Sequence, residues 1–157
     1  MNTECHRIAD QLSATIDGRA GYGSPLRDIL KDISAKQAQA HPIADVHSIW
    51  ELLHHVDRWV EFAIGALDGV PIPRWPGMPV EMDWPPVTDT SEAAWNRALE
   101  SFFSRHLQLV ERIKNFSDDQ LEATVPGRTY SCYRLFQGTM QHAIYHAGQI
   151  AVLKKML

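Results

Sequence analysis

The chain contains few residues of the kinds that cross-link small folds or span membranes. Only two cysteines occur in 157 residues, Cys5 and Cys132, and they lack the CxxC spacing of a thiolate zinc site or redox pair. No apolar run approaches the roughly 18 residues of a membrane span, and the first twenty residues alternate polar and apolar positions, unlike a signal peptide. We therefore expect a cytoplasmic protein without membrane association, in which both cysteines are reduced and buried.

An excess of positive charge is also missing. The formal net charge is −4 and the isoelectric point is near 6.0, so no basic stripe is available for phosphate backbones and nucleic-acid binding is not expected. Hydrophobic residues make up 45% and charged residues 22% of the chain, which is typical of a globular protein. With no internal repeat or linker, residues 1–157 are predicted to form one domain.

Apolar residues recur at three- and four-residue steps, which predicts an all-α fold with four long helices. The first covers residues 4–17, and the second begins at the capping box formed by Ser48 and Glu51 and stops before Gly69. The third starts after a cap at residues 89–92 and ends near Asn115, and the last runs from residues 130–131 to the C-terminus. Short extra helices are predicted after Ser24-Pro25, read as N-cap and first helical residue, and after Ser34.

Residues 70–88 contain six of the nine prolines together with Trp75 and Trp84. Such a segment cannot be a regular helix or a central strand. It is predicted to be a long crossover loop. Its tryptophans either wall a pocket at the bundle or only seal the core, and the sequence leaves both interpretations open.

Two histidines stand four residues apart in the last predicted helix. His142 and His146 project from neighbouring turns of one face, with Cβ atoms about 5–6 Å apart, close enough to bind one metal ion. At about 100° per residue they share an arc with Leu135, Thr139, Gln149, Ile150 and Leu153. The pair is therefore predicted to face the core, where each ring needs a partner for at least one nitrogen. A shared ion would meet that need, as would backbone carbonyls or water.

Two other helices each add an inward-facing histidine. On the second long helix His55 falls within the apolar arc, near Trp59, whereas His54 falls outside it and is predicted to be a solvated surface residue. His106 lies on the apolar face of the third helix, where a lone histidine is typical of a hydrogen-bonded core residue and is also a candidate pocket residue. His55, His142 and His146 together make a candidate three-imidazole metal site with an open coordination position.

Other metal classes fit the pattern less well. The segment 142–146 lacks the glutamate of an HExxH protease, and no acidic residue stands three before either histidine, as a di-iron carboxylate bundle requires. Imidazole ligands suit zinc, nickel, copper or iron. Glu51, four residues before His55, could support that ligand or serve only the capping box.

The stretch from Ser48 to Val56, followed by Trp59 and later by residues 145–150, resembles the DinB/YfiT-like family of metal-binding four-helix proteins. The similarity extends from Ser24 onward and includes the turn at 125–128. It implies an up-down-down-up four-helix bundle, a homodimer, and a divalent metal, zinc first and nickel second. The family's ligand positions fall on His55, His142 and His146.

The resemblance implies an enzyme for a small-molecule substrate, either a thiol-dependent S-transferase using a low-molecular-weight thiol or a hydrolase. The alternative is a non-catalytic metal-binding or stress-response bundle whose metal is structural. Candidate pocket residues are Trp59, His106, Tyr145 and Gln149. Arg58 and Arg74 are either surface charges or partners of a substrate carboxylate, and no residue stands out as a general base.

Overall fold

Four long helices form the body of the molecule in the computed structural model, which describes residues 3–74 and 76–157. They are α1 (Glu4–Asp17), α4 (Ile49–Leu67), α6 (Glu92–Lys114) and α7 (Cys132–Lys154). This described part contains no strand, only an isolated bridge between Thr124 and Ser131, so the predicted all-α class is confirmed. None of its helices has both the length and the apolar character to cross a membrane.

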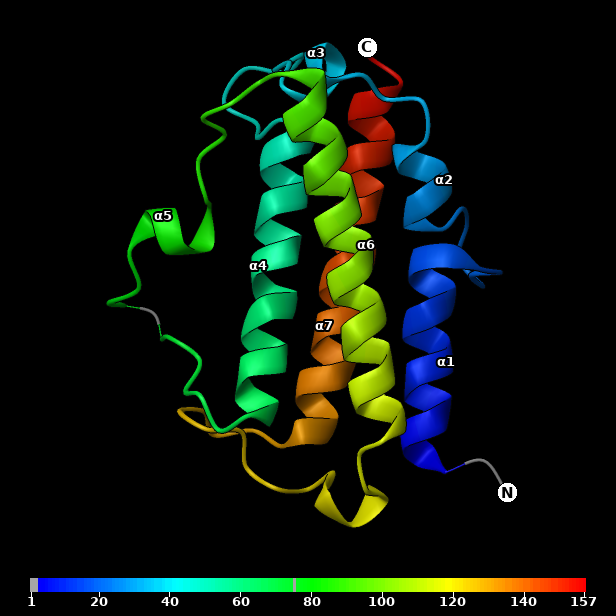
Figure 1. The fold of residues 1–157 in the computed structure, drawn as a ribbon, viewed down its shortest axis with the longest axis vertical. Helices are drawn as coiled ribbons and strands as arrows, with labels where there is room; N and C mark the ends of the chain where they lie inside the picture. The colour runs from blue at the N-terminus through cyan, green and yellow to red at the C-terminus, as the bar shows by residue number, and fades with distance from the viewer. Residues whose placement is uncertain (1–2, 75) are drawn as a thin grey trace.

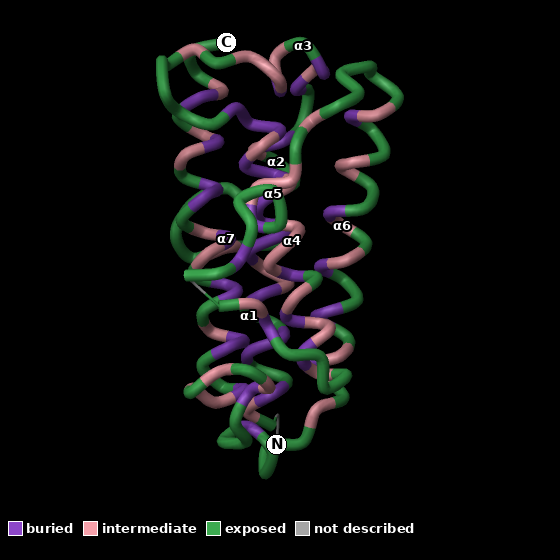
Figure 2. The backbone as a smooth tube through the Cα atoms, turned by 90° about the vertical axis from the view of Figure 1, so that its left-hand side faces the viewer, coloured by how far each residue is buried: buried purple, intermediate pink, exposed green. Residues whose placement is uncertain are grey.

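The long helices pack around a common core. Helices α1 and α4 each pack against both α6 and α7. In Figure 1, α1 and α7 run upward while α4 and α6 run downward, and the two termini lie at opposite ends. Figure 2 shows that buried positions recur along each long helix, as expected when one stripe of each helix faces the core.

Side-chain caps fix where the long helices begin. The Ser48 hydroxyl accepts the Glu51 N–H while the Glu51 carboxylate accepts the Ser48 N–H, which completes the predicted capping box of α4. Single serine caps, Ser91 and Ser131, open α6 and α7. Each cap satisfies backbone N–H groups that the first helical turn leaves without partners. The first residues of these helices could therefore be predicted from the capping residues in the sequence.

Two short helices, α2 (Leu26–Leu30) and α3 (Ala35–Ala38), connect α1 to α4. The predicted start of α2 was wrong by one residue, because Pro25 is the N-cap and has an extended backbone with ψ of 161°. Its carbonyl already accepts the Asp28 and Ile29 N–H groups, so no side-chain cap is needed.

Helix α4 ends before Gly69, whose φ of +84° is a left-handed conformation that glycine adopts without strain. The proline-rich residues 70–88, here called the strap, then pass beside α4 and contain the single-turn helix α5 (Val80–Asp83) (Figure 1). The strap is anchored to the loop before α7, where the Ile72 N–H donates to the Pro126 carbonyl and the Arg128 guanidinium to that of Pro73.

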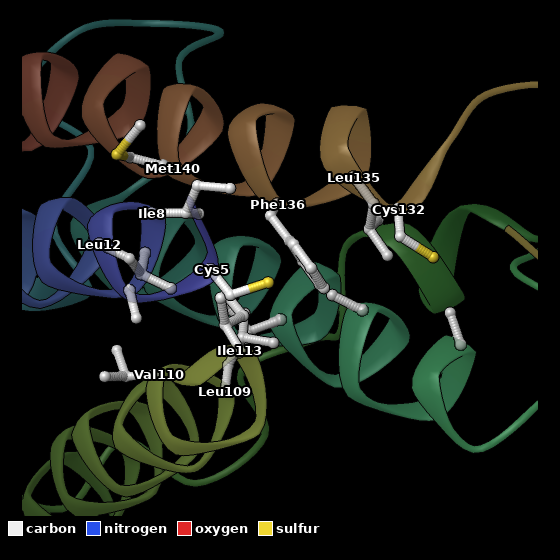
Figure 3. Close-up of a cluster of buried hydrophobic side chains, with 14 of the residues drawn as sticks. Cys5, Ile8, Leu12, Leu109, Val110, Ile113, Cys132, Leu135, Phe136 and Met140 are labelled. Carbon is white, nitrogen blue, oxygen red and sulfur yellow. The ribbon is translucent and has the colours of Figure 1, made fainter. Parts of the chain in front are cut away.

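Two apolar clusters fill the interior. One includes Cys5 and Leu12 of α1 with Leu109 of α6 and Phe136 of α7, and Figure 3 shows these elements converging. The other contains the first half of α4, including Trp50, and the second half of α7. Both cysteines are free and buried, as predicted.

Candidate metal centre

Helices α4 and α7 bring three histidines together. His55 is 6% exposed and His146 is 5% exposed, which confirms their predicted inward orientation, while His142 is half-buried. The Nε2 atom of His142 lies 3.0 Å from Nε2 of His55 and 3.0 Å from Nε2 of His146. One nitrogen from each of the three rings lies within 4.8 Å of the other two.

The opposite ring nitrogens show which atoms carry protons. His55 Nδ1 lies 2.9 Å from the backbone carbonyl of Asp83, and His146 Nδ1 lies 2.6 Å from Oε1 of Gln149. Carbonyl oxygens only accept, so both Nδ1 atoms are the donors and both Nε2 atoms hold lone pairs. This arrangement is the one in which partners behind a histidine orient it as a metal ligand.

A cation suits this cluster better than a proton does. His142 Nε2 can carry one hydrogen, which can be donated to His55 or to His146 but not to both. At least one contact would then bring two lone pairs together at 3.0 Å. A metal ion accepts all three lone pairs at once, so the donor set fits a divalent ion of the kind that imidazole binds.

The surroundings keep all three rings neutral, which is the form that binds metal. Burial, together with smaller effects of the nearby His146 and His55, lowers the pKa of His142 to about 3. The pKa values of His55 and His146 are also lowered, first by burial. Asp83 and Gln149 counteract the fall through their hydrogen bonds to Nδ1.

The strap covers His55 with two consecutive residues. The ring of Trp84 stacks on His55 at 3.9 Å between centroids and 6° between planes, and His47 stacks on the opposite face of Trp84 at 3.6 Å. The buried Asp83 accepts a 2.7 Å hydrogen bond on Oδ1 from Nε1 of Trp59. Sequence reasoning missed Asp83 and His47; an acidic residue beside a tryptophan in the loop was the only signal. Trp75, also considered there, lies outside the described residues.

A cavity of about 810 Å³ opens beside the cluster. His55 and His142 form part of its wall, together with Trp59 and Asp83. Its other side consists of the first half of α7 and the loop before it, including Tyr130 and Arg134. The three-histidine cluster is therefore reachable from a space large enough for a small molecule.

The four candidate pocket residues have different environments. Trp59 lines the cavity, and Gln149 supports His146 from behind. Tyr145 is 64% exposed and borders a separate apolar hollow. His106 is fully buried beside Phe102 and is not a member of the three-histidine group.

The arginines considered as carboxylate partners are engaged elsewhere. Arg58 forms an ion pair with Glu61, and the Arg74 guanidinium donates to the Gly127 carbonyl. Neither lines the cavity; Arg134 does.

The prediction for His54 was wrong, because this ring is half-buried under the strap. Its Nδ1 lies 3.3 Å from the Pro85 carbonyl, to which it donates, and its Nε2 accepts from the Trp50 indole at 3.0 Å. A helical wheel shows only which side of α4 faces the bundle, and it cannot show that the strap returns over the other side.

Residues 24–150 match the family model of the DinB superfamily. The chain belongs to the DinB superfamily. This superfamily is commonly metal-binding, in agreement with a histidine cluster that could hold an ion. No curated protein and no solved structure shows a significant match to this DinB-superfamily chain.

Proposed function

We propose that this DinB-superfamily protein is a metal-dependent enzyme acting on a small molecule, with His55, His142 and His146 as the metal ligands. The convergence of three Nε2 atoms, two of them on histidines that line a large cavity, carries the proposal. Three protein ligands leave coordination positions open, which is typical of catalytic sites and unlike closed structural ones.

The residues that contact the three histidines orient the rings and cover them. The Asp83 carbonyl and the Gln149 side chain hold His55 and His146 in the tautomer that presents Nε2. Trp84 and Trp59 shield the His55 ring from water on the strap side. A divalent ion bound to three neutral imidazoles would supply Lewis acidity and lower the pKa of a water or thiol in the cavity.

Two reactions use that chemistry: transfer of the sulfur of a low-molecular-weight thiol to an electrophile, and hydrolysis by water. The resemblance to thiol-dependent relatives favours S-transfer. Among the described cavity residues Asp83 is the only carboxylate, and its Oδ1 accepts a hydrogen bond from Trp59. A metal held by the three histidines would lower the pKa of a bound thiol or water, whose proton would then pass to solvent. Zinc is the first candidate and nickel the second.

The alternative is a non-catalytic bundle with a structural metal. Such a site should be closed by a fourth protein ligand. Among the residues that the structure describes, the candidate group has three members, and His106 is not one of them. The enzyme proposal is therefore the better supported of the two.

Elemental analysis of purified wild-type protein beside His55→Ala and His142→Ala variants tests the metal centre. We expect close to one zinc or nickel per chain in wild type and loss of metal in both variants, with helical circular dichroism retained. His54→Ala is the matched control, since both nitrogens of His54 are hydrogen-bonded elsewhere, and it should keep the metal.

Thermal melting with and without a chelator completes this test. A ligand that binds only the folded state raises the melting temperature, so the chelator should lower that of wild type and leave His55→Ala unchanged. The proposal would be overturned if purified wild-type protein contained no metal and its melting temperature did not change when zinc or nickel was added.

A cytoplasmic homodimer completes the proposed function. Support for self-association comes from the outer face of α7, where Tyr145 and Val152 are exposed beside Ile43 and Val46. Exposed apolar side chains that cluster are typical of an interaction surface.

A further inference from the structure

The wall of the cavity beside the histidines combines aromatic and apolar side chains with polar ones, which include Gln137, Thr139 and Gln141. Trp59 lies on the α4 side, and its ring centroid is 6.0 Å from that of His142. Tyr130, Tyr133 and Leu135 line the cavity from the loop before α7 and the first turn of α7. Flat and branched side chains contributed by two parts of the wall suit a ligand with an aromatic or branched apolar body.

The described part of the wall carries one positive side chain, the exposed Arg134, and one negative side chain, the buried Asp83. Arg134 is the one lysine or arginine among the described cavity residues, and it has no acidic partner within 4.0 Å in that part of the chain. The one carboxylate, Asp83, lies against Trp59 and His55 and forms no ion pair with Arg134, so the guanidinium is available to a ligand. Arginine binds carboxylates through two parallel hydrogen bonds, and a bound divalent ion would add positive charge at the inner end.

Gly138 leaves part of the cavity open. It lies inside α7, where glycine costs roughly 1 kcal/mol relative to alanine. No close packing by the described residues explains this cost, since a Cβ added at Gly138 would meet none of their atoms within 4 Å. Gly138 is one helical turn from both Arg134 and His142, and it lines the cavity with them. A side chain here would occupy the space that a ligand needs.

We propose that the cavity binds a small carboxylate with an aromatic or branched apolar body, whose carboxylate is held by Arg134 and whose body lies over Gly138 against Trp59. This inference names the substrate class of the proposed enzyme and rests on that proposed function for the reaction. Binding of the carboxylate, by contrast, needs no metal, because Arg134 and the aromatic wall supply it.

Calorimetric titration with 3-phenylpropionate and its neutral amide, 3-phenylpropionamide, tests the inference in zinc-loaded and in chelator-treated protein. Wild type should prefer the carboxylate by about tenfold in both states, as expected for a charge-assisted hydrogen-bonded pair. Arg134→Gln should reduce the preference to about threefold or less in chelator-treated protein. The metal content of this variant should remain that of wild type.

Gly138→Leu and Gly148→Leu form a matched pair. Both glycines lie inside α7 with open space around an added Cβ, but Gly148 borders a different hollow. Leucine is a better helix former than glycine, so both variants should fold, which circular dichroism checks. We expect Gly138→Leu to weaken binding of both probes at least tenfold, and Gly148→Leu to bind them as wild type does.

The outcomes separate this inference from the proposed metal centre. Equal affinity for carboxylate and amide, equal losses in the two glycine variants, or no binding at millimolar probe would overturn the ligand class. Carboxylate-selective binding that needs Arg134 and an open Gly138, in a protein that never takes up metal, would support the cavity while overturning the metal centre.

Discussion

Adjacent residues His54 and His55 of α4 show how environment divides the roles of one residue type. His55 Nδ1 is bound by the Asp83 carbonyl, so its Nε2 faces His142. His54 uses both nitrogens, one toward Pro85 and one toward the Trp50 indole. Only His55 therefore has a lone pair free for a metal.

His106 is a third kind of histidine, buried without a ligand role in the described cluster. Its Nδ1 donates to the Phe102 carbonyl at 2.8 Å, and its Nε2 is buried without a hydrogen-bond partner. Burial lowers the pKa of His106 to about 4. The neutral ring is tolerated in the core, whereas the charged ring would lack solvation.

This burial predicts that His106 weakens the fold in acid. Between pH 6.5 and pH 4, position 106 is largely protonated in the unfolded chain, where its pKa is near 6.5. It is largely neutral in the native protein, where its pKa is about 4. The free energy of unfolding should therefore fall as the pH drops from 6.5 toward 4, by up to about 3 kcal/mol from this group. Urea unfolding of wild type and His106→Leu between pH 4 and 7 measures the effect. The variant should lose less stability over this range, and parallel curves would contradict the assignment.

At the scale of elements, the strap contacts the histidines of α4 through three consecutive residues. Asp83 accepts from His55, Trp84 stacks on the same ring, and the Pro85 carbonyl accepts from His54. Asp83 is the last residue of the single-turn helix α5, and Trp84 is its C-cap. The strap therefore orients His55, one of the three candidate ligands, as well as covering the bundle.

We expect Asp83→Ala to weaken metal binding by about tenfold or more, as loss of a partner behind a metal ligand typically does. The carboxylate ties the strap to Trp59, and without it the carbonyl that orients His55 loses its anchor. Asp83→Asn keeps an oxygen acceptor and should recover most of the affinity. Competition with a chromophoric chelator gives the dissociation constants.

Glu81→Ala is the control for Asp83, since Glu81 occupies the same turn but is exposed. It should bind metal as wild type does. If the alanine variants at 81 and 83 bind equally tightly, the strap does not position His55.

Across the whole molecule, the histidines lie where the two apolar clusters meet. On α4, Val56 belongs to one cluster and Val60 to the other; on α7, Met140 and Ala143 divide in the same way. His106 lies between Phe102 and Leu109, which also belong to different clusters. The bundle thus has a layer of histidines across its core, and the apolar clusters on both sides of this layer stabilise the fold.

The exposed apolar face of α7 predicts a homodimer at the scale of the whole molecule. Sedimentation analysis at micromolar concentration should give twice the chain mass, and Tyr145→Glu with Val152→Glu should give a monomer because buried charges would lack partners. Leu107→Glu, on exposed α6 surface, is the control and should leave the dimer intact. A monomeric wild type would contradict this prediction.

The sequence alone determined the four long helices and the inward direction of His55 and His146, but not the single-turn helix α5. Caps such as Ser48 with Glu51 and the 3.6-residue period act over one or two turns, so they can be read without knowledge of the fold. That these residues bind metal stays a prediction, as does the single domain. The sequence could not show that Tyr145 lies away from the histidine cavity.

Only the tertiary structure decided what surrounds the histidines. Asp83 is 28 residues from His55 in the sequence, so their contact depends on the path of the strap. His142 is 87 residues from His55, so their contact depends on the packing of α4 on α7. The cavity bounded by Arg134 and Gly138 has the same origin, because an opening between separate elements exists only once they pack. Periodicity within one helix determines which side faces inward, and contacts between elements determine what that side meets.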